Sequence, residues 1–285
     1  MEKIVNQELR NLNLCWNVNR LGLNTNKTNF VIFHSPQNFI PKMITLKISR
    51  KAISQKDYIK YLGITMDCHL NWKQHILNIS KKISRSIGVM YKLRHYINLS
   101  MLVNIYYSLI YPHLIYAVQV WGSACKTELN KLLVLQKKAV RMMTFNDQIP
   151  QIPGPLYNSN PLFYELKILK IDDIFNYHVC KFVYSCLSYS SPYIFHDWYQ
   201  INSRFHNYNT TSNTVITMNN NFDINSIVET NLLHTRYSRL VHYGGKTLKV
   251  SGPLYWNMLP ENIRNSQSIF SFKNKLKSYF INQYI

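Results

Sequence analysis

The amino-acid sequence predicts an α+β fold with a small N-terminal sheet and a mainly helical remainder. Short apolar or alternating runs, which are typical of strands, occur within the first 70 residues. From Trp72 onward the apolar residues instead recur every three or four positions, which is the spacing of amphipathic helices. The 285 residues are 46% hydrophobic and 14% aromatic, so the chain can bury a core and is not a disordered polypeptide.

One helix and two short strands are predicted before residue 50. The helix spans 5–20, and the strands span 30–33 and 43–48. The helix residues that we expect to face the core recur at helical spacing and are Val5, Leu9, Leu12 and Trp16.

A third strand is predicted over 58–66. In this stretch Leu62, Ile64 and Met66 share one face, which we expect to be buried. Gly63 leaves the opposite face nearly bare. A glycine inside a strand is typical of a bulge or of the close approach of another backbone.

Two amphipathic helices with cationic outer faces are predicted between Trp72 and Arg141, a segment with 11 Lys and Arg residues and a single acid, Glu128. The stripe expected to be buried in the first helix consists of Trp72, Ile76, Ile79, Ile83, Ile87 and Met90. Its outward-facing cations are Lys81, Arg85 and Lys92. The second helix is expected to start with Thr127 as its N-cap and to bury Leu129, Leu133, Val140 and Met143. Its outward-facing cations are Lys131, Lys137, Lys138 and Arg141.

The net charge of the chain predicts a polyanionic partner, either a nucleic acid or an acidic membrane surface. The formal charge is +20 and the isoelectric point is near 9.7. Residues 1–150 carry 21 Lys and Arg against 6 Asp and Glu, whereas residues 151–285 carry 12 against 7. A charged helix face is usually only solvated, but two successive faces of one sign favour binding to phosphates.

An apolar stretch between Leu102 and Trp121 raises the possibility of a membrane span. No Asp, Glu, Lys or Arg occurs between Tyr96 and Cys125. However, polar residues and Pro112 interrupt the stretch, so we expect two buried helices that break at Pro112 rather than a membrane protein.

The last 140 residues predict a linker followed by a mixed, mostly helical segment. The linker spans 148–160, helices are expected over 162–187, and the Asn-rich stretch 202–225 reads as a loop. Packed structure is expected over 250–285. Its aromatic and aliphatic anchors are Trp256, Phe270, Phe272, Leu276 and Phe280.

The cysteines and the N-terminus predict an intracellular protein, nuclear or cytoplasmic. The five cysteines are odd in number and scattered, which is typical of free thiols in a reducing compartment. Cys180 with Cys186, and Cys68 with His69, lack the paired short spacing of a zinc site, so no metal ligands are predicted. Polar residues follow Met1 directly, so we expect no signal peptide.

Many short motifs, in order, resemble the reverse transcriptases of jockey-like non-LTR retrotransposons. The N-terminal ones are Trp16, Leu23-Asn24, Lys27-Thr28, Val31-Ile32-Phe33, Lys60-Tyr61-Leu62-Gly63, Asp67, Leu70 and Trp72. The middle ones are Tyr106 to Tyr116, Trp121-Gly122 and Leu135 to Arg141. The C-terminal ones are His206 to Thr210, Gly252-Pro253, Trp256 to Pro260, Phe272-Lys273 and Leu276-Lys277. The resemblance covers nearly the whole chain.

The resemblance implies an arrangement of domains. Residues 1–71 would be the end of the polymerase palm, with a partial sheet, and residues 72–147 a helical thumb. After the linker, residues 161–285 would form the C-terminal retrotransposon domain. Lys27 would be the palm lysine beside the departing pyrophosphate. Lys60, Tyr61 and Gly63 would belong to the primer grip, where strand backbone presses against the primer end.

The resemblance also implies which activity to expect. In the intact family enzyme, paired aspartates of a palm hairpin hold Mg²⁺, and we expect this chain to begin after that hairpin. The one adjacent acidic pair, Asp172-Asp173, reads as the start of a helix. We therefore expect a truncated fragment without cofactor or small-molecule substrate that binds RNA, DNA or their hybrid without polymerising, and in which Lys27 is idle. The alternatives are an inert basic RNA-binding protein and a membrane-associated protein; no oligomeric state is predicted.

Overall fold

The computed structural model describes residues 2–37, 44–49, 51–144, 158–201, 214–215, 228–229, 232–235 and 247–285. The chain forms two compact units, Met1–Ile79 and Ser80–Ile285. Short two-stranded sheets lie in the first unit and most of the helices in the second, which confirms the predicted α+β fold. Much of the predicted linker, the first part of the strand at 43–48 and nearly all of the Asn-rich stretch fall outside the described residues.

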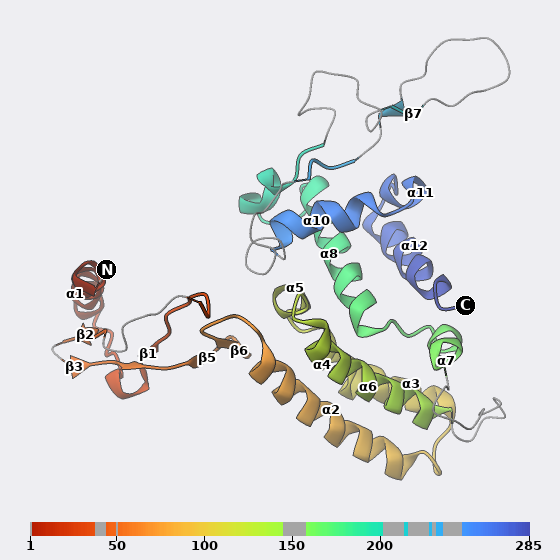
Figure 1. Cartoon of the computed structure of the whole chain (residues 1–285), viewed down its shortest axis with the longest axis horizontal. Helices are drawn as coiled ribbons and strands as arrows, with labels where there is room; N and C mark the ends of the chain where they lie inside the picture. The colour runs from red at the N-terminus through yellow and green to blue at the C-terminus, as the bar shows by residue number, and fades with distance from the viewer. Residues whose placement is uncertain are drawn as a thin grey trace. The chain divides into compact units, whose positions relative to one another are not determined.

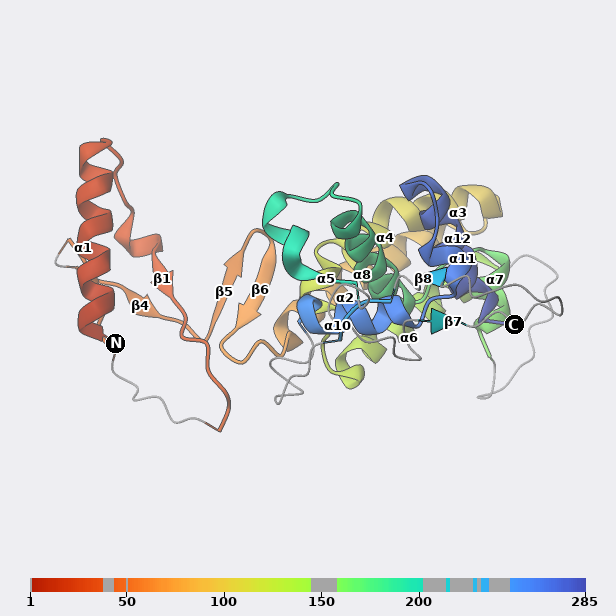
Figure 2. The same ribbon diagram turned by 90° about the horizontal axis from the view of Figure 1, so that it is seen from above.

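The first unit has a small core between a helix and two strand pairs. Helix α1 (Glu2–Val18) packs against β2 (Lys47–Ile48), which pairs antiparallel with β3 (Lys51–Ala52). Strand β1 (Asn29–Phe30), shorter than the predicted strand 30–33, pairs parallel with β4 (Ser54–Gln55), and both lie beside α1 in Figure 2. The core consists of Leu46, Ile48 and Ile53, covered by Val5, Leu9, Trp16, Phe30 and Ile44.

Leu12 does not join this core. Its side chain is exposed, although its spacing on α1 matches that of the buried stripe. Strands β2 and β3 beneath α1 are each only two residues long, so they cover the helix incompletely.

The predicted single strand at 58–66 is instead a β-hairpin. Strand β5 (Tyr58–Tyr61) pairs antiparallel with β6 (Ile64–Asp67), with Tyr61 opposite Ile64 (Figure 2). The two residues between the strands have positive φ, 44° at Leu62 and 83° at Gly63, the sign pattern of a type I′ turn.

Gly63 therefore supplies a left-handed turn position rather than a bare strand face. Leu62, which was expected to be buried, is 71% exposed at the tip. The prediction failed because an apolar/polar alternation continues unbroken through a two-residue turn, and Leu-Gly lacks the Asn-Gly or Asp-Gly signal of such turns.

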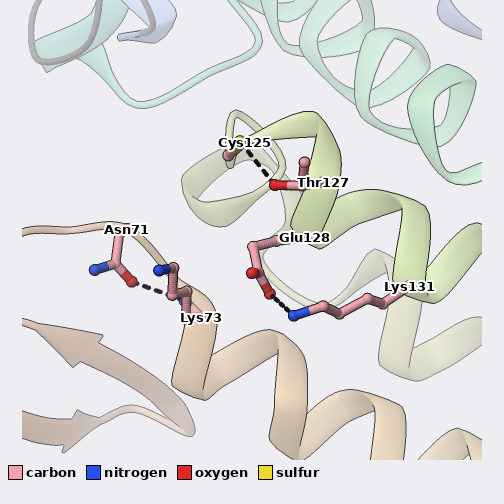
Figure 3. Close-up of polar contacts among 6 residues, drawn as sticks. All are labelled: Asn71, Lys73, Cys125, Thr127, Glu128 and Lys131. Carbon is pink, nitrogen blue, oxygen red and sulfur yellow. Dashed lines mark hydrogen bonds and ion pairs between the residues drawn. The ribbon is translucent and has the colours of Figure 1, made fainter.

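Helix α2 (Lys73–Leu93) begins in the first unit and ends in the second. The side chain of Asn71 accepts the backbone amide of Lys73 at 3.0 Å and so caps its first turn (Figure 3). The predicted stripe is buried along its whole length, from Trp72 to Met90.

Helix α8 (Ile171–Leu187) is the centre of the second unit (Figure 1). It packs against α4 (Tyr111–Ile115), α5 (Val118–Trp121) and α6 (Lys126–Met143). It also packs against α10 (Leu248–Asn257) and α12 (Ile269–Asn282). The shorter elements of this unit are α7 (Asn160–Glu165), η2 (Tyr193–Trp198), α11 (Glu261–Arg264) and the antiparallel pair β7 (Thr214–Val215) and β8 (Val228–Glu229). The largest buried side chains include Trp121, Trp256, Tyr106, Phe163 and Phe272.

The uncharged stretch around residue 110 folds into three short helices rather than two. Helix α3 (Leu99–Leu109) ends before Pro112, which lies in the first turn of α4. A second break follows at Ala117, whose φ is 49°. In the part of the chain that the structure describes, no helix is both long and apolar enough to cross a bilayer.

The predicted C-terminal anchors are buried except for one. Trp256, Phe272, Leu276 and Phe280 lie in the core. Phe270, by contrast, is 72% exposed, because it lies half a turn from the Phe272, Leu276 and Phe280 stripe of α12.

Candidate nucleic-acid interface

The outer face of α2 carries the first set of predicted phosphate-binding cations. Lys81, Arg85 and Lys92 are all exposed, on the side of the helix opposite the buried stripe. Lys82 is exposed next to them. Burial lowers the pKa of His113 on α4, and the positive charge of Lys82 lowers it further.

The four predicted cations of α6 differ in their exposure and in their hydrogen bonds and ion pairs. Lys138 is exposed on the outer face, whereas Lys137 is half-buried. The exposed Arg141 donates from Nε to Ser159 Oγ at 3.1 Å. Lys131, 58% exposed, forms an ion pair of 2.6 Å with the carboxylate of Glu128 (Figure 3). Lys131 therefore contributes little net charge.

The start of α6 differs from the prediction. The N-cap is Cys125 rather than Thr127, and its side chain makes no capping bond to the backbone. The Thr127 hydroxyl lies 3.0 Å from Cys125 Sγ instead (Figure 3). Three of the four residues predicted to be buried, Leu129, Val140 and Met143, are buried. The fourth, Leu133, is only half-buried, and its neighbour Leu132 is fully buried instead.

Two lysines outside the predicted set, Lys170 and Lys277, each have another lysine nearby. Burial lowers the pKa of Lys170; the charge of Asp173 opposes this shift and the charge of Lys137 adds to it. On α12, burial and the charge of Lys167 lower the pKa of Lys277. The two lysines of each pair are far apart in sequence, so no local sequence pattern predicts that they lie near each other.

The hairpin tip of the first unit places its predicted primer-grip residues in solvent. Lys60 and Gly63 are exposed, and Tyr61 is 60% exposed. Tyr61 sits opposite Ile64, directly beside the turn. The tip therefore presents an ammonium group and an aromatic ring next to an open backbone turn, which are groups that can contact a nucleic-acid strand.

The predicted palm lysine, Lys27, closes a single 3-10 turn, η1 (Thr25–Lys27). The Asn24 side chain accepts the backbone amides of Asn26 and Lys27 at 3.1 and 3.2 Å. The Lys27 side chain is exposed, and among the described residues it makes no hydrogen bond or ion pair. Its position is fixed by the turn, but its amine is surrounded by solvent.

The acidic pair Asp172-Asp173 lies in the first turn of α8, as predicted. The Asp173 carboxylate accepts a hydrogen bond from the hydroxyl of Tyr284. Burial raises the pKa of Asp173, although the hydroxyl and Lys170 oppose this shift. The Asp173 carboxylate thus joins the start of α8 to the C-terminal Tyr284 through a hydrogen bond.

The chain is similar to polymerases of mobile elements over part of its length. It is 34% identical over 132 residues to the RNA-directed DNA polymerase from mobile element jockey of Drosophila melanogaster, covering 45% of this chain and 14% of that protein. It is 32% identical over 162 residues to the RNA-directed DNA polymerase from mobile element jockey of Drosophila funebris, covering 55% and 16%. It is 25% identical over 170 residues to the probable RNA-directed DNA polymerase from transposon X-element of Drosophila melanogaster, covering 59% and 17%.

These matches make the chain a distant homologue of jockey-like non-LTR reverse transcriptases, which confirms the family resemblance at that level. The aligned segments span only 14% to 17% of the relatives' length. The region of the polymerase to which the chain corresponds stays a prediction. No protein-family model matches the chain, and no solved structure matches it.

Proposed function

We propose that this chain binds a template–primer duplex through its sugar-phosphate backbone, as a piece of a non-LTR reverse transcriptase. Residues 1–71 would act as the end of the palm, 72–147 as the thumb and 161–285 as the following domain. The distant homology supports the family, and the order of the motifs supports the assignment of regions.

The observation that carries the proposal is the uniform sign of the exposed charge on α2 and α6. Between Trp72 and Arg141 the only acid is Glu128, and its carboxylate is already paired with Lys131. Lys81, Arg85 and Lys138 thus have no acidic competitor among the described residues of this segment. Cations of this kind bind phosphates without reading base sequence, and their binding weakens steeply with salt.

We further propose that the hairpin tip contacts the primer strand. Lys60 and Tyr61 lie beside the exposed turn that contains Gly63. A turn without a bulky side chain at Gly63 allows a second backbone to come close. Lys27 has no catalytic role in this proposal.

Polymerisation by this 285-residue polypeptide is not part of the proposal. Two-metal catalysis needs acidic side chains that converge on the ions, which in the family enzyme are Mg²⁺. The acidic pair that the chain offers lies at the start of α8, where Asp173 is bonded to Tyr284. We expect no primer extension with magnesium or manganese, and extension in an assay free of other polymerases would contradict this.

The test is equilibrium binding of an RNA–DNA hybrid at several salt concentrations. We expect the triple variant Lys81→Ala, Arg85→Ala, Lys138→Ala to weaken binding to hybrids of any sequence about equally. The logarithmic salt dependence should become shallower by about 0.9 for each phosphate group that the variant leaves unneutralised. The absence of binding by the unsubstituted chain at low salt would refute the proposal.

The ion pair on α6 offers a matched control. The double variant Glu128→Ala, Lys131→Ala removes one acid and one base, so the net charge is unchanged. We expect its affinity for the hybrid to stay within a factor of about two, because the two opposite charges of the pair cancel and add no net charge to the phosphate-binding surface. An equal loss of affinity in the control and the triple variant would mean that disturbed folding, not the removal of phosphate-binding cations, weakens binding.

Competition experiments address the alternative readings of the basic surface. A thumb that holds a duplex should prefer the hybrid to single-stranded RNA of the same length. Preference for the single strand would favour an independent RNA-binding protein. Binding to anionic vesicles but not to either nucleic acid would favour a membrane-surface role.

A further inference from the structure

Two histidines and a cysteine converge in the first unit, at the base of the hairpin. His34 lies four residues after β1, and Cys68 and His69 directly follow β6. The Cys68 sulfur and one ring nitrogen of each histidine all lie within 4.8 Å of one another. Cys68 and His69 alone lack the paired short spacing of a zinc site, so no metal ligands were predicted; the fold supplies the missing third group from 34 residues away.

Backbone hydrogen bonds hold these three residues together. The His34 amide donates to the Cys68 carbonyl at 3.0 Å. The imidazole rings of His34 and His69 meet edge to face, with centroids 4.6 Å apart. The arrangement is therefore fixed by the main chain and does not depend on flexible side chains reaching across solvent.

The hydrogen bonds of the rings leave one nitrogen of each histidine available. His34 Nδ1 lies 2.9 Å from the Ser35 carbonyl oxygen, and His69 Nδ1 lies 3.1 Å from the His34 carbonyl oxygen. A carbonyl oxygen can only accept, so Nδ1 carries the proton in each ring and Nε2 keeps its lone pair. Metal-bound histidines characteristically donate their other ring N–H to a carbonyl or carboxylate in this way.

The surroundings also favour a cation. The Cys68 amide donates to the Asp57 carbonyl at 2.9 Å, and Asp67 directly precedes Cys68, so two acidic residues lie near the site and their negative charge attracts a positive ion. Asp67 is not a free ligand, because its two oxygens accept the amides of His69, Asn71 and Trp72. A partly buried set of two imidazoles and one thiolate suits zinc, whereas Mg²⁺ and Ca²⁺ prefer oxygen ligands.

We propose that His34, Cys68 and His69 bind one zinc ion, with water in the fourth position. The ion would join the segment after β1 to the loop between β6 and α2, which follow strands of two separate sheets. Its binding free energy would add to the stability of the first unit, because the unfolded chain has no preformed site. The proposal is independent of nucleic-acid binding.

Cobalt(II) titration of the full chain tests the site, because cobalt replaces zinc and reports its ligands. We expect a thiolate-to-cobalt charge-transfer band and the strong visible bands of a tetrahedral ion, which saturate at one equivalent and disappear when zinc is added. Cys68→Ser should abolish the charge-transfer band. His34→Gln should weaken cobalt binding by more than the roughly 10- to 100-fold that loss of an outer-shell partner costs.

The matched control is Cys15→Ser, which removes an exposed cysteine from the same unit. We expect it to leave the cobalt spectrum unchanged. A charge-transfer band that persists in Cys68→Ser, or none in the unsubstituted chain, would overturn the proposal.

A measurement on the unsubstituted chain avoids any question of misfolded variants. Zinc should slow the alkylation of Cys68, mapped by mass spectrometry, but not that of the exposed Cys15 and Cys125. Equal alkylation rates of Cys68 with and without zinc would overturn the proposal as well.

Discussion

Asp67 Oδ2 accepts the backbone amide of Trp72 at 2.9 Å, across the loop that connects the hairpin to α2. Its other oxygen accepts the amides of His69 and Asn71, both at 3.1 Å. Leu70 and Trp72 adopt φ values of 51° and 65°, which non-glycine residues rarely take. One carboxylate therefore stabilises an unfavourable loop backbone, and in doing so it positions the first residue of the buried stripe of α2.

Asp67→Ala should destabilise the first unit. Three charge-assisted acceptor bonds are removed and the strained loop is released, so we expect the free energy of unfolding to fall by about 2 to 3 kcal/mol. Urea titration followed by tryptophan fluorescence measures this change. Asp57→Ala is the control, because the Asp57 side chain is exposed and makes no hydrogen bond among the described residues. Equal destabilisation of both variants would contradict the assigned role of Asp67.

Gln136→Leu should destabilise the second unit by about 3 kcal/mol, because it leaves several buried polar groups unpaired. The fully buried Gln136 amide donates to the Tyr106 hydroxyl at 2.9 Å and to the Leu169 carbonyl at 3.1 Å. Its oxygen accepts the Ile171 amide at 2.8 Å, at the start of α8. Helix content measured against urea concentration reports the change.

The control for this prediction lies on the same helix. Asn130→Leu replaces an exposed amide of α6 by the same apolar residue. We expect its free energy of unfolding to change by less than about 0.5 kcal/mol. A destabilisation as large as that of Gln136→Leu would show that an added leucine, not the broken network, is responsible.

The sequence predicted helices well where one apolar stripe decides the structure. The stripe of α2 is buried as expected, and the acids of Asp172-Asp173 begin α8 as expected. The prediction from sequence failed where the backbone conformation of two residues determines the structure, as at the turn of Leu62 and Gly63. The pattern of apolar and polar residues does not indicate the sign of φ.

Some residues of the motifs that carry the family resemblance have packing roles in this chain. Trp121 donates its indole N–H to the Tyr116 carbonyl at 2.8 Å, and Gly122 leaves room for the ring of Phe175. Gly252 likewise leaves room for Tyr199. The motifs did not indicate these packing partners, since residues that pack α8 are distant in sequence from those they touch.

Lowering the pH should decrease the stability of the second unit, because His178 is partly buried in it. Burial, with a smaller effect of Lys181, lowers the pKa of His178 from 6.5 to about 4, and its Nε2 has no hydrogen-bond partner among the described residues. Because the pKa of His178 is lower in the folded chain, the unfolded chain binds the proton more readily than the folded chain does. The contribution of neutral His178 is therefore complete above pH 6.5 and is lost as the pH falls through about 4.

His178→Phe isolates this effect from that of other groups. Asp173, whose pKa is raised, contributes with the opposite sign, so stability must be compared between variant and unsubstituted chain at each pH. We expect the urea midpoint of the variant to fall less between pH 6.5 and 4 than that of the unsubstituted chain. His95→Gln, an exposed histidine, is the control. Parallel curves for all three proteins would contradict the prediction.

Two tyrosines of one strand give a matched test of the hairpin tip. Tyr58 and Tyr61 are each 60% exposed, but only Tyr61 adjoins the turn, and the two face opposite sides of the hairpin. If the tip contacts the primer strand, Tyr61→Ala should weaken hybrid binding by about fivefold or more, the effect of removing roughly 1 kcal/mol of stacking. Tyr58→Ala should bind like the unsubstituted chain. Equal affinities for the two variants, measured at one salt concentration, would remove the tip from the interface and leave the cations of α2 and α6 to bind the duplex alone.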